Sequence, residues 1–126
     1  MKRIIGISLF AIIALSLPLL AAGQKGPHGG QIVLSGSHRF EMVVGDTHFE
    51  TYVMNLKKQV LPLKGVTGTA TIHSDNDKKT DNVSLTVSGD HLVGNINIKK
   101  LGKAEVHLKI VVDGKEAAIE FQYPPD

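Results

Sequence analysis

The chain contains no cysteine and no tryptophan, and its aromatic residues are limited to four phenylalanines and two tyrosines. Without cysteine there are no disulfide bonds, no thiolate metal ligands and no cysteine nucleophile, so packing alone must hold the fold together. The Cys…Trp…Cys hallmark of antibody-type immunoglobulin domains is excluded for the same reason. A G-x-S-x-G nucleophile motif is also missing, and we therefore expect a protein that is not an enzyme.

The amino terminus has the pattern of a secretory signal peptide. Lys2 and Arg3 are positive, residues 4–20 are almost wholly apolar, and small residues follow at 21–23. This pattern predicts export and cleavage after the small residues. The alternative is an uncleaved membrane anchor, for which the apolar run is short. No cysteine follows the run, which excludes a bacterial lipoprotein.

Removal of the signal peptide changes the charge of the protein. The full sequence has 14 Lys and Arg residues against 12 Asp and Glu residues, and Lys2 and Arg3 lie within the predicted signal peptide, 1–23. The mature chain, 24–126, then has no net charge while its histidines are neutral. This balance predicts no binding to nucleic acid and none to a membrane after cleavage. Its length suits one hydrophobic core, so we expect one periplasmic domain.

From residue 31 onward, apolar and polar residues alternate in short segments, which is the pattern of β-strands. The segments lie at 40–44, 49–54, 66–73, 83–87, 92–98, 106–112 and 117–123. Gly45 with Asp46, and Asp113 with Gly114, predict hairpin turns between neighbouring segments. Beyond the signal peptide no segment has a convincing helical period. We therefore expect an all-β fold, an antiparallel immunoglobulin-like β-sandwich of seven or eight strands, with a small β-barrel as the alternative.

The stretch at residues 26–31 (GPHGGQ) is the most unusual part of the mature sequence. Pro27 restricts the backbone before His28, and two glycines free it afterwards. Backbone geometry, more than packing, would therefore present this histidine. His28 is either a metal ligand or polar anchor, or an ordinary exposed residue in a glycine-rich segment, and the sequence leaves both interpretations open.

This stretch and the strands after it resemble a segment of bacterial heavy-metal efflux systems. The resemblance rests on the HGG triplet at 28–30, SHRFEMVV at 37–44, YV at 52–53 and KQVLPL at 58–63. The family segment lies near the amino terminus of periplasmic adaptor proteins of the resistance-nodulation-division type, and also in small free-standing periplasmic proteins. The resemblance covers about residues 26–72. It implies an accessory domain linked to metal handling, with an efflux adaptor or another periplasmic protein as its partner.

Candidate metal ligands gather around the first predicted hairpin. Imidazole is a good ligand for copper, zinc and nickel, and thioether sulfur is one for Cu(I). The predicted ligands of a copper or zinc ion are His28, His38, His48, Glu41 and Met42. We expect His28 to lead this set, with His38 and His48 as helpers. For Met42 the alternative is a place in the core.

Strand periodicity predicts which side chains share a face, because residues two apart point to the same side of a sheet. One face of the second strand carries Phe49, Thr51 and Val53, and the other carries His48, Glu50, Tyr52 and Met54. If the first face lies in the core, the second faces solvent or a partner. His73, His91 and His107 fall on the polar faces of their strands, and we expect them to be solvated.

Two functions are consistent with these observations. The first is a periplasmic, non-enzymatic binding module associated with heavy-metal handling or efflux, which binds a transition metal through its histidines. The alternative is a metal-free protein-interaction module of the periplasm, which binds through a sheet edge or through the face that carries His48 and Tyr52. A hydrolase or isomerase is disfavoured by the missing motifs.

Overall fold

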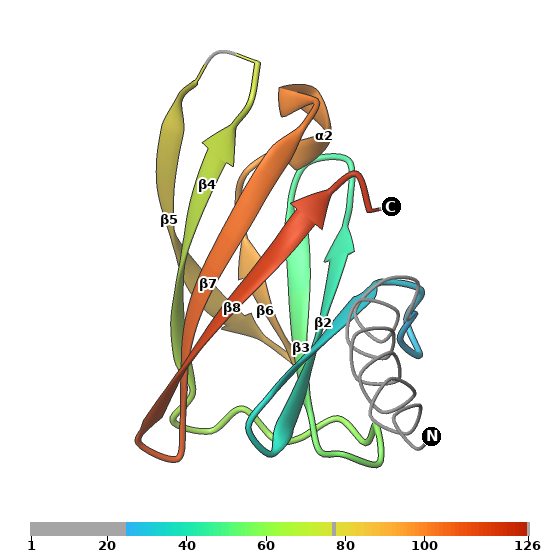
Figure 1. Ribbon diagram of the computed structural model, residues 1–126. Coiled ribbons are helices and arrows are strands. Elements are labelled where there is room, and N and C mark those ends of the chain that lie inside the picture. Colours follow the sequence, from blue (N-terminus) through green and yellow to red (C-terminus); the bar gives the residue numbers. More distant parts are fainter. Residues whose placement is uncertain (1–24, 77, 126) are drawn as a thin grey trace, which may run out of the picture.

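The computed structural model describes residues 25–76 and 78–125, and the predicted signal peptide lies outside them. This part of the chain forms eight strands and one short helix (Figure 1). The strands are β1 (Gln31–Ser35), β2 (His38–Val44), β3 (Phe49–Met54), β4 (Thr67–Ser74), β5 (Thr80–Ser88), β6 (His91–Gly94), β7 (Ala104–Val112) and β8 (Lys115–Tyr123). The helix, α2 (Ile98–Leu101), lies between β6 and β7. Within the described residues, no helix has the length and hydropathy to span a bilayer.

All eight strands belong to one antiparallel sheet with the order β1-β2-β3-β6-β5-β4-β7-β8. The sheet folds over itself, so that β7 and β8 lie in front of β2, β3 and β6 (Figure 1). The edge strands approach each other, and the side-chain amide of Gln31 on β1 donates a hydrogen bond of 2.8 Å to the carbonyl of Gln122 on β8. The predicted all-β antiparallel fold is confirmed, with a shape between a sandwich and a nearly closed barrel.

The hydrophobic core lies between the two layers of the folded sheet. Phe40 and Phe49 from one layer meet Phe121 from the other within a single cluster of buried side chains. Thr51 and Val53 are buried together with Phe49, as their shared face predicts. Burying one large apolar side chain stabilises the folded state by about 2 kcal/mol. In a chain without disulfides, this burial is the main stabilising contribution.

The turn between β7 and β8 sets the register of the last hairpin. Asp113 and Gly114 both have positive φ angles, 52° and 77°, which a two-residue type I′ turn requires. The predicted turn is confirmed. Because a two-residue turn leaves Val112 opposite Lys115, it also places His107 opposite Glu120.

The expected strand over 92–98 is wrong beyond Gly94, where β6 ends. The chain turns instead into α2, because the Asn97 side chain accepts a hydrogen bond from the backbone N–H of Lys100 and so caps a helical turn. Ile98 is fully buried by this turn. Alternation of apolar residues cannot separate this single turn from the end of a strand.

Candidate functional site

The structure divides the five predicted ligands between the two faces of β2. Glu41 points to the outer face of the sheet, and Met42 points into the core, as consecutive residues of a strand must. Met42 is 1% exposed. His38 lies at the start of β2 and lines a pocket with Val112 and Lys115. Of the predicted ligands, His28 and Glu41 are in direct contact, whereas His38 and Met42 lie elsewhere.

Glu41 is a fully buried carboxylate that accepts hydrogen bonds from the segment before β1. Its Oε2 accepts hydrogen bonds from the backbone N–H groups of His28, at 2.9 Å, and Gly30, at 2.8 Å. Its Oε1 accepts one from Nδ1 of His28 at 2.7 Å. A Cβ atom at Gly26 would overlap the carboxylate, which explains the need for glycine there. Glu41 thus anchors the segment before β1 and fixes the ring of His28.

The His28 ring stacks on Tyr52, with ring centroids 3.7 Å apart and an interplanar angle of 5°. Tyr52 also contacts His91 on β6, at a centroid distance of 5.2 Å. These contacts leave Tyr52 only 7% exposed, and Met54 on the same side of β3 is fully buried. The expectation that this side of β3 faces solvent or a partner is therefore wrong for Tyr52 and Met54, which are buried within the chain itself.

Glu50 lies beside this aromatic group, and its carboxylate contacts polar atoms of His48, Tyr52 and His91. Its Oε2 is 3.2 Å from Nε2 of His48 and 3.6 Å from Nε2 of His91, while its Oε1 accepts a hydrogen bond of 3.1 Å from the Tyr52 hydroxyl. Burial raises the pKa of Glu50, but hydrogen bonds from His48 and Tyr52 and the charges of His91 and His48 outweigh it, so the net shift is downward. His48 is thus connected to His28 through Glu50 and Tyr52 and does not contact it directly in these interactions.

The Tyr52 hydroxyl responds in the opposite direction. Burial raises the pKa of Tyr52 to about 12, with further contributions from its hydrogen bond to Glu50 and from the negative charges of Glu50, Asp90 and Glu41. Tyr52 therefore stays neutral and donates a hydrogen bond to Glu50 throughout the physiological pH range. The phenol holds Glu50 in place and does not itself carry charge.

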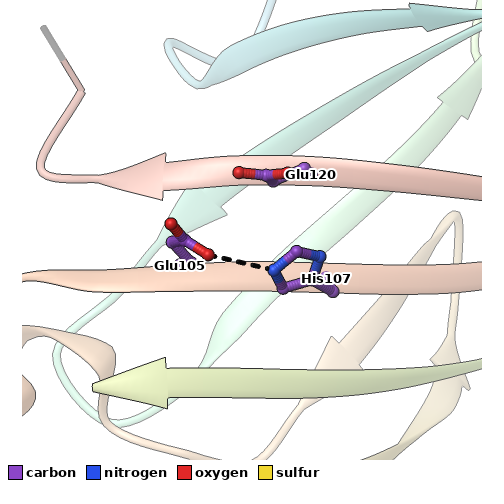
Figure 2. Close-up of side chains that lie close together, drawn as sticks. All are labelled: Glu105, His107 and Glu120. Atoms are coloured by element: carbon purple, nitrogen blue, oxygen red, sulfur yellow. Dashed lines mark hydrogen bonds and ion pairs between the residues drawn. The ribbon is translucent and has the colours of Figure 1, made fainter. Parts of the chain in front are cut away.

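A second group of ligand-type side chains lies on the outer face of β7 and β8. The ligand atoms of Glu105, His107 and Glu120 all lie within 4.8 Å of one another, and among the described residues this is the group that meets this criterion. Figure 2 shows the three side chains on adjacent strands, with Glu105 Oε1 3.2 Å from Nε2 of His107. A metal ion could be held by this cluster.

Strand pairing builds this cluster. His107 faces Glu120 directly across the β7–β8 ladder, and Glu105 lies two residues before His107 on the same face. His73 on β4 approaches from the other side, and its ring meets that of His107 edge-on at a centroid distance of 5.1 Å. His107 and Glu105 are 40% and 43% exposed, so the cluster is open to solvent.

Three of the residues in these groups have environments that the sequence pattern did not predict. His91 was expected to be solvated, but its side chain is only 20% exposed because it packs against Tyr52. His73 and His107 are open to solvent, as expected, yet their rings contact each other, and His107 also contacts Glu105. Strand alternation gives the face of a residue and not its neighbours across the sheet. The metal site predicted from His28, His38, His48, Glu41 and Met42 stays a prediction.

No family model, no curated protein and no solved structure matches this chain.

Proposed function

We propose that the mature protein is a periplasmic, non-enzymatic module that binds a divalent transition metal at Glu105, His107 and Glu120. The observation that supports this proposal is the convergence of their ligand atoms within 4.8 Å. One imidazole and two carboxylates are a ligand set that suits zinc or Cu(II). Export and the periplasmic location rest on the signal-peptide pattern at 1–23.

The surroundings of the cluster favour an oxidised, borderline metal ion over Cu(I). Cu(I) prefers sulfur ligands, and the thioethers of Met42 and Met54 are buried away from the outer surface. Carboxylate oxygens and an imidazole nitrogen both bind Zn²⁺, at about 2.0–2.2 Å. Zinc is therefore the first ion to test, with Cu²⁺ second.

Exposure of the cluster suggests how the metal would be used. Three protein ligands leave a fourth tetrahedral position open, and Glu105 and His107 are both more than a third exposed. A structural zinc site is normally closed by four protein ligands. An open site on a sheet surface suits capture and release of an ion, with the fourth ligand from water or from a partner such as an efflux adaptor.

Metal binding is tested by titrating the chelator-treated protein with Zn²⁺, Cu²⁺ and Mg²⁺ in a calorimeter and by recording thermal melts. At a free ion concentration 100 times the Kd, binding to the native state adds about 2.7 kcal/mol to the free energy of unfolding. We expect zinc to raise the melting temperature of the wild-type protein and His107→Ala or Glu120→Gln to weaken this effect at least tenfold in concentration.

His38→Ala is the matched control, because His38 is also a half-exposed histidine on a strand but lies at the β1–β2 turn. It should bind zinc like the wild type. If zinc leaves the wild-type melting temperature unchanged, or if His38→Ala and His107→Ala lose the same affinity, the proposal is wrong. The metal-free interaction module would then be the better hypothesis.

A further inference from the structure

The carboxylate of Glu50 lies beside two imidazoles. It is on the layer opposite the cluster of Glu105, His107 and Glu120, called the Glu105 cluster below. Nε2 of His48, just before β3, and Nε2 of His91, at the start of β6, both face the same carboxylate oxygen, Oε2, at 3.2 and 3.6 Å. Nitrogen and oxygen lone pairs of this kind are metal ligands when no proton lies between them. The arrangement brings imidazoles from positions 48 and 91 to one carboxylate, although the two ring nitrogens lie further apart than the 4.8 Å that joins the ligand atoms of the Glu105 cluster.

The two ring nitrogens of His91 face two different carboxylates, an arrangement that calls for a positive charge on the ring or beside it. Nδ1 of His91 lies 3.0 Å from Oδ1 of Asp90, and Nε2 faces Glu50. A neutral imidazole has one N–H, so it can donate to only one of these two carboxylates. The other nitrogen then directs its lone pair at a negatively charged oxygen. A second proton on His91 removes this conflict, and a metal ion between Nε2 and Oε2 removes it equally well.

We infer that Nε2 of His48, Oε2 of Glu50 and Nε2 of His91 form a second transition-metal site. This site goes beyond the proposed function, because it shares no residue with the Glu105 cluster. Its ligand set of two histidines and one glutamate is one that zinc uses in proteins, with a further position left open.

Neighbouring groups orient the two imidazoles for such a role. Asp90 accepts a hydrogen bond from Nδ1 of His91, which leaves the Nε2 lone pair free for a metal, and a carboxylate of this kind commonly supports a ligating histidine. The Thr47 hydroxyl lies 3.3 Å from Nδ1 of His48 and can serve His48 in the same way. The Tyr52 hydroxyl holds the other oxygen of Glu50, which leaves Oε2 for the ion.

The stacked rings of His28 and Tyr52 support one side of the site. Tyr52 contacts His91, and His28 is fixed on Tyr52 by the buried Glu41. The His91 side of the site is therefore backed by packed side chains. His48 is the adjustable member: it is 37% exposed and lies outside the strand, so rotation of its side chain can bring Nε2 from beside Glu50 to metal-bonding distance.

Counting bound zinc separates the two sites. Equilibrium dialysis of the chelator-treated protein with Zn²⁺, followed by metal analysis, should give two zinc ions per wild-type chain, one for His107→Ala, one for Glu50→Gln, and none for the double variant. His91→Asn should reproduce the effect of Glu50→Gln. Losing a direct ligand should weaken zinc at this site at least about tenfold.

A spectroscopic measurement ties the ion to the named atoms. In His107→Ala, zinc should shift the imidazole nitrogen resonances assigned to Nε2 of His48 and His91 and leave those of His38 unchanged. The inference is overturned if His107→Ala binds no zinc, or if Glu50→Gln binds as much as the wild type while both variants keep the wild-type circular dichroism spectrum. Two ions that are both insensitive to His107→Ala would instead overturn the proposed function.

Discussion

The two outer faces of the folded sheet hold histidine–carboxylate groups of similar composition in very different surroundings. On the layer with β2, β3 and β6, Glu41 is fully buried and its neighbour Tyr52 is 7% exposed. On the layer with β7 and β8, Glu105 and His107 are 43% and 40% exposed. The first group is covered by the segment before β1, and the second lies open on its strands.

This difference shows two ways in which a sheet can position charged side chains. On the open face, strand register alone brings Glu105, His107 and Glu120 together, so the group costs little desolvation and its members stay mobile. On the covered face, hydrogen bonds to buried atoms fix His28 and Tyr52, and each buried charge must be satisfied locally. We expect the buried contacts of the covered face to matter for stability, whatever binds beside them, and the open face to matter for binding only.

The largest expected effect is the removal of the buried carboxylate by Glu41→Ala. This change leaves the N–H groups of His28 and Gly30 without their acceptor and releases the His28 ring. Because these buried donors are then left without a hydrogen-bond acceptor, the free energy of unfolding should fall by about 2–3 kcal/mol. Urea unfolding of the chelator-treated protein measures it.

Glu120→Ala is the matched control on the open face, since it removes the same carboxylate from an exposed position. It should change the free energy of unfolding by less than about 0.5 kcal/mol. Equal destabilisation by the two variants would contradict the comparison, because burial would then not distinguish the two carboxylates.

A smaller effect is expected from the neutral phenol of Tyr52 in alkaline solution. The pKa of Tyr52 in the folded protein is about 12, above its ordinary value of 10.0, first because of burial and then because of Glu50. The Tyr52 hydroxyl therefore loses its proton at a lower pH in the unfolded chain than in the folded protein. The stability that the neutral phenol contributes is fully present below pH 10 and is lost as the pH rises toward 12.

Absorbance of the phenolate in the chelator-treated protein checks this expectation. The chain has two tyrosines, and the Tyr52→Phe variant should lack the titration step near pH 12. Its free energy of unfolding should also fall less steeply than that of the wild type between pH 10 and 12. A wild-type protein that shows no titration step near pH 12 would indicate that Tyr52 is not shielded.

Much of the fold follows from the sequence because alternation and turn residues are local signals. The hairpin turns at Gly45 with Asp46 and at Asp113 with Gly114 are correct, and β2, β3, β7 and β8 lie where alternation predicts them. The helical turn at α2 was missed, because it depends on the Asn97 cap and on burial of Ile98. Such a turn is too short to show a helical period.

Less of the candidate site was predictable, although one signal was available. The two-residue turn at Asp113 and Gly114 fixes the pairing of the last hairpin, so His107 opposite Glu120 could have been inferred from the sequence. The contact of His91 with Glu50 could not, because it depends on β6 pairing with β3 across an intervening segment that includes β4 and β5. Non-local strand order leaves no local pattern in a single sequence.

The smallest expected effect concerns Lys99 on α2 and Asp46 in the β2–β3 turn, which form an exposed ion pair at 2.9 Å. The hydrogen bond from Lys99, and then its charge, lower the pKa of Asp46. Any stability from this pair is therefore present above the ordinary pKa of Asp46, 3.8, and is lost as the pH falls through the lowered value. Lys99→Gln should leave the melting temperature at neutral pH almost unchanged, because water and salt screen exposed pairs. Melts of both proteins from neutral to acidic pH, at low and high salt, measure the difference. If Lys99→Gln destabilises the protein as much as Glu41→Ala does, a short distance between charges would be sufficient for stability, and the contrast between covered and open faces would fail.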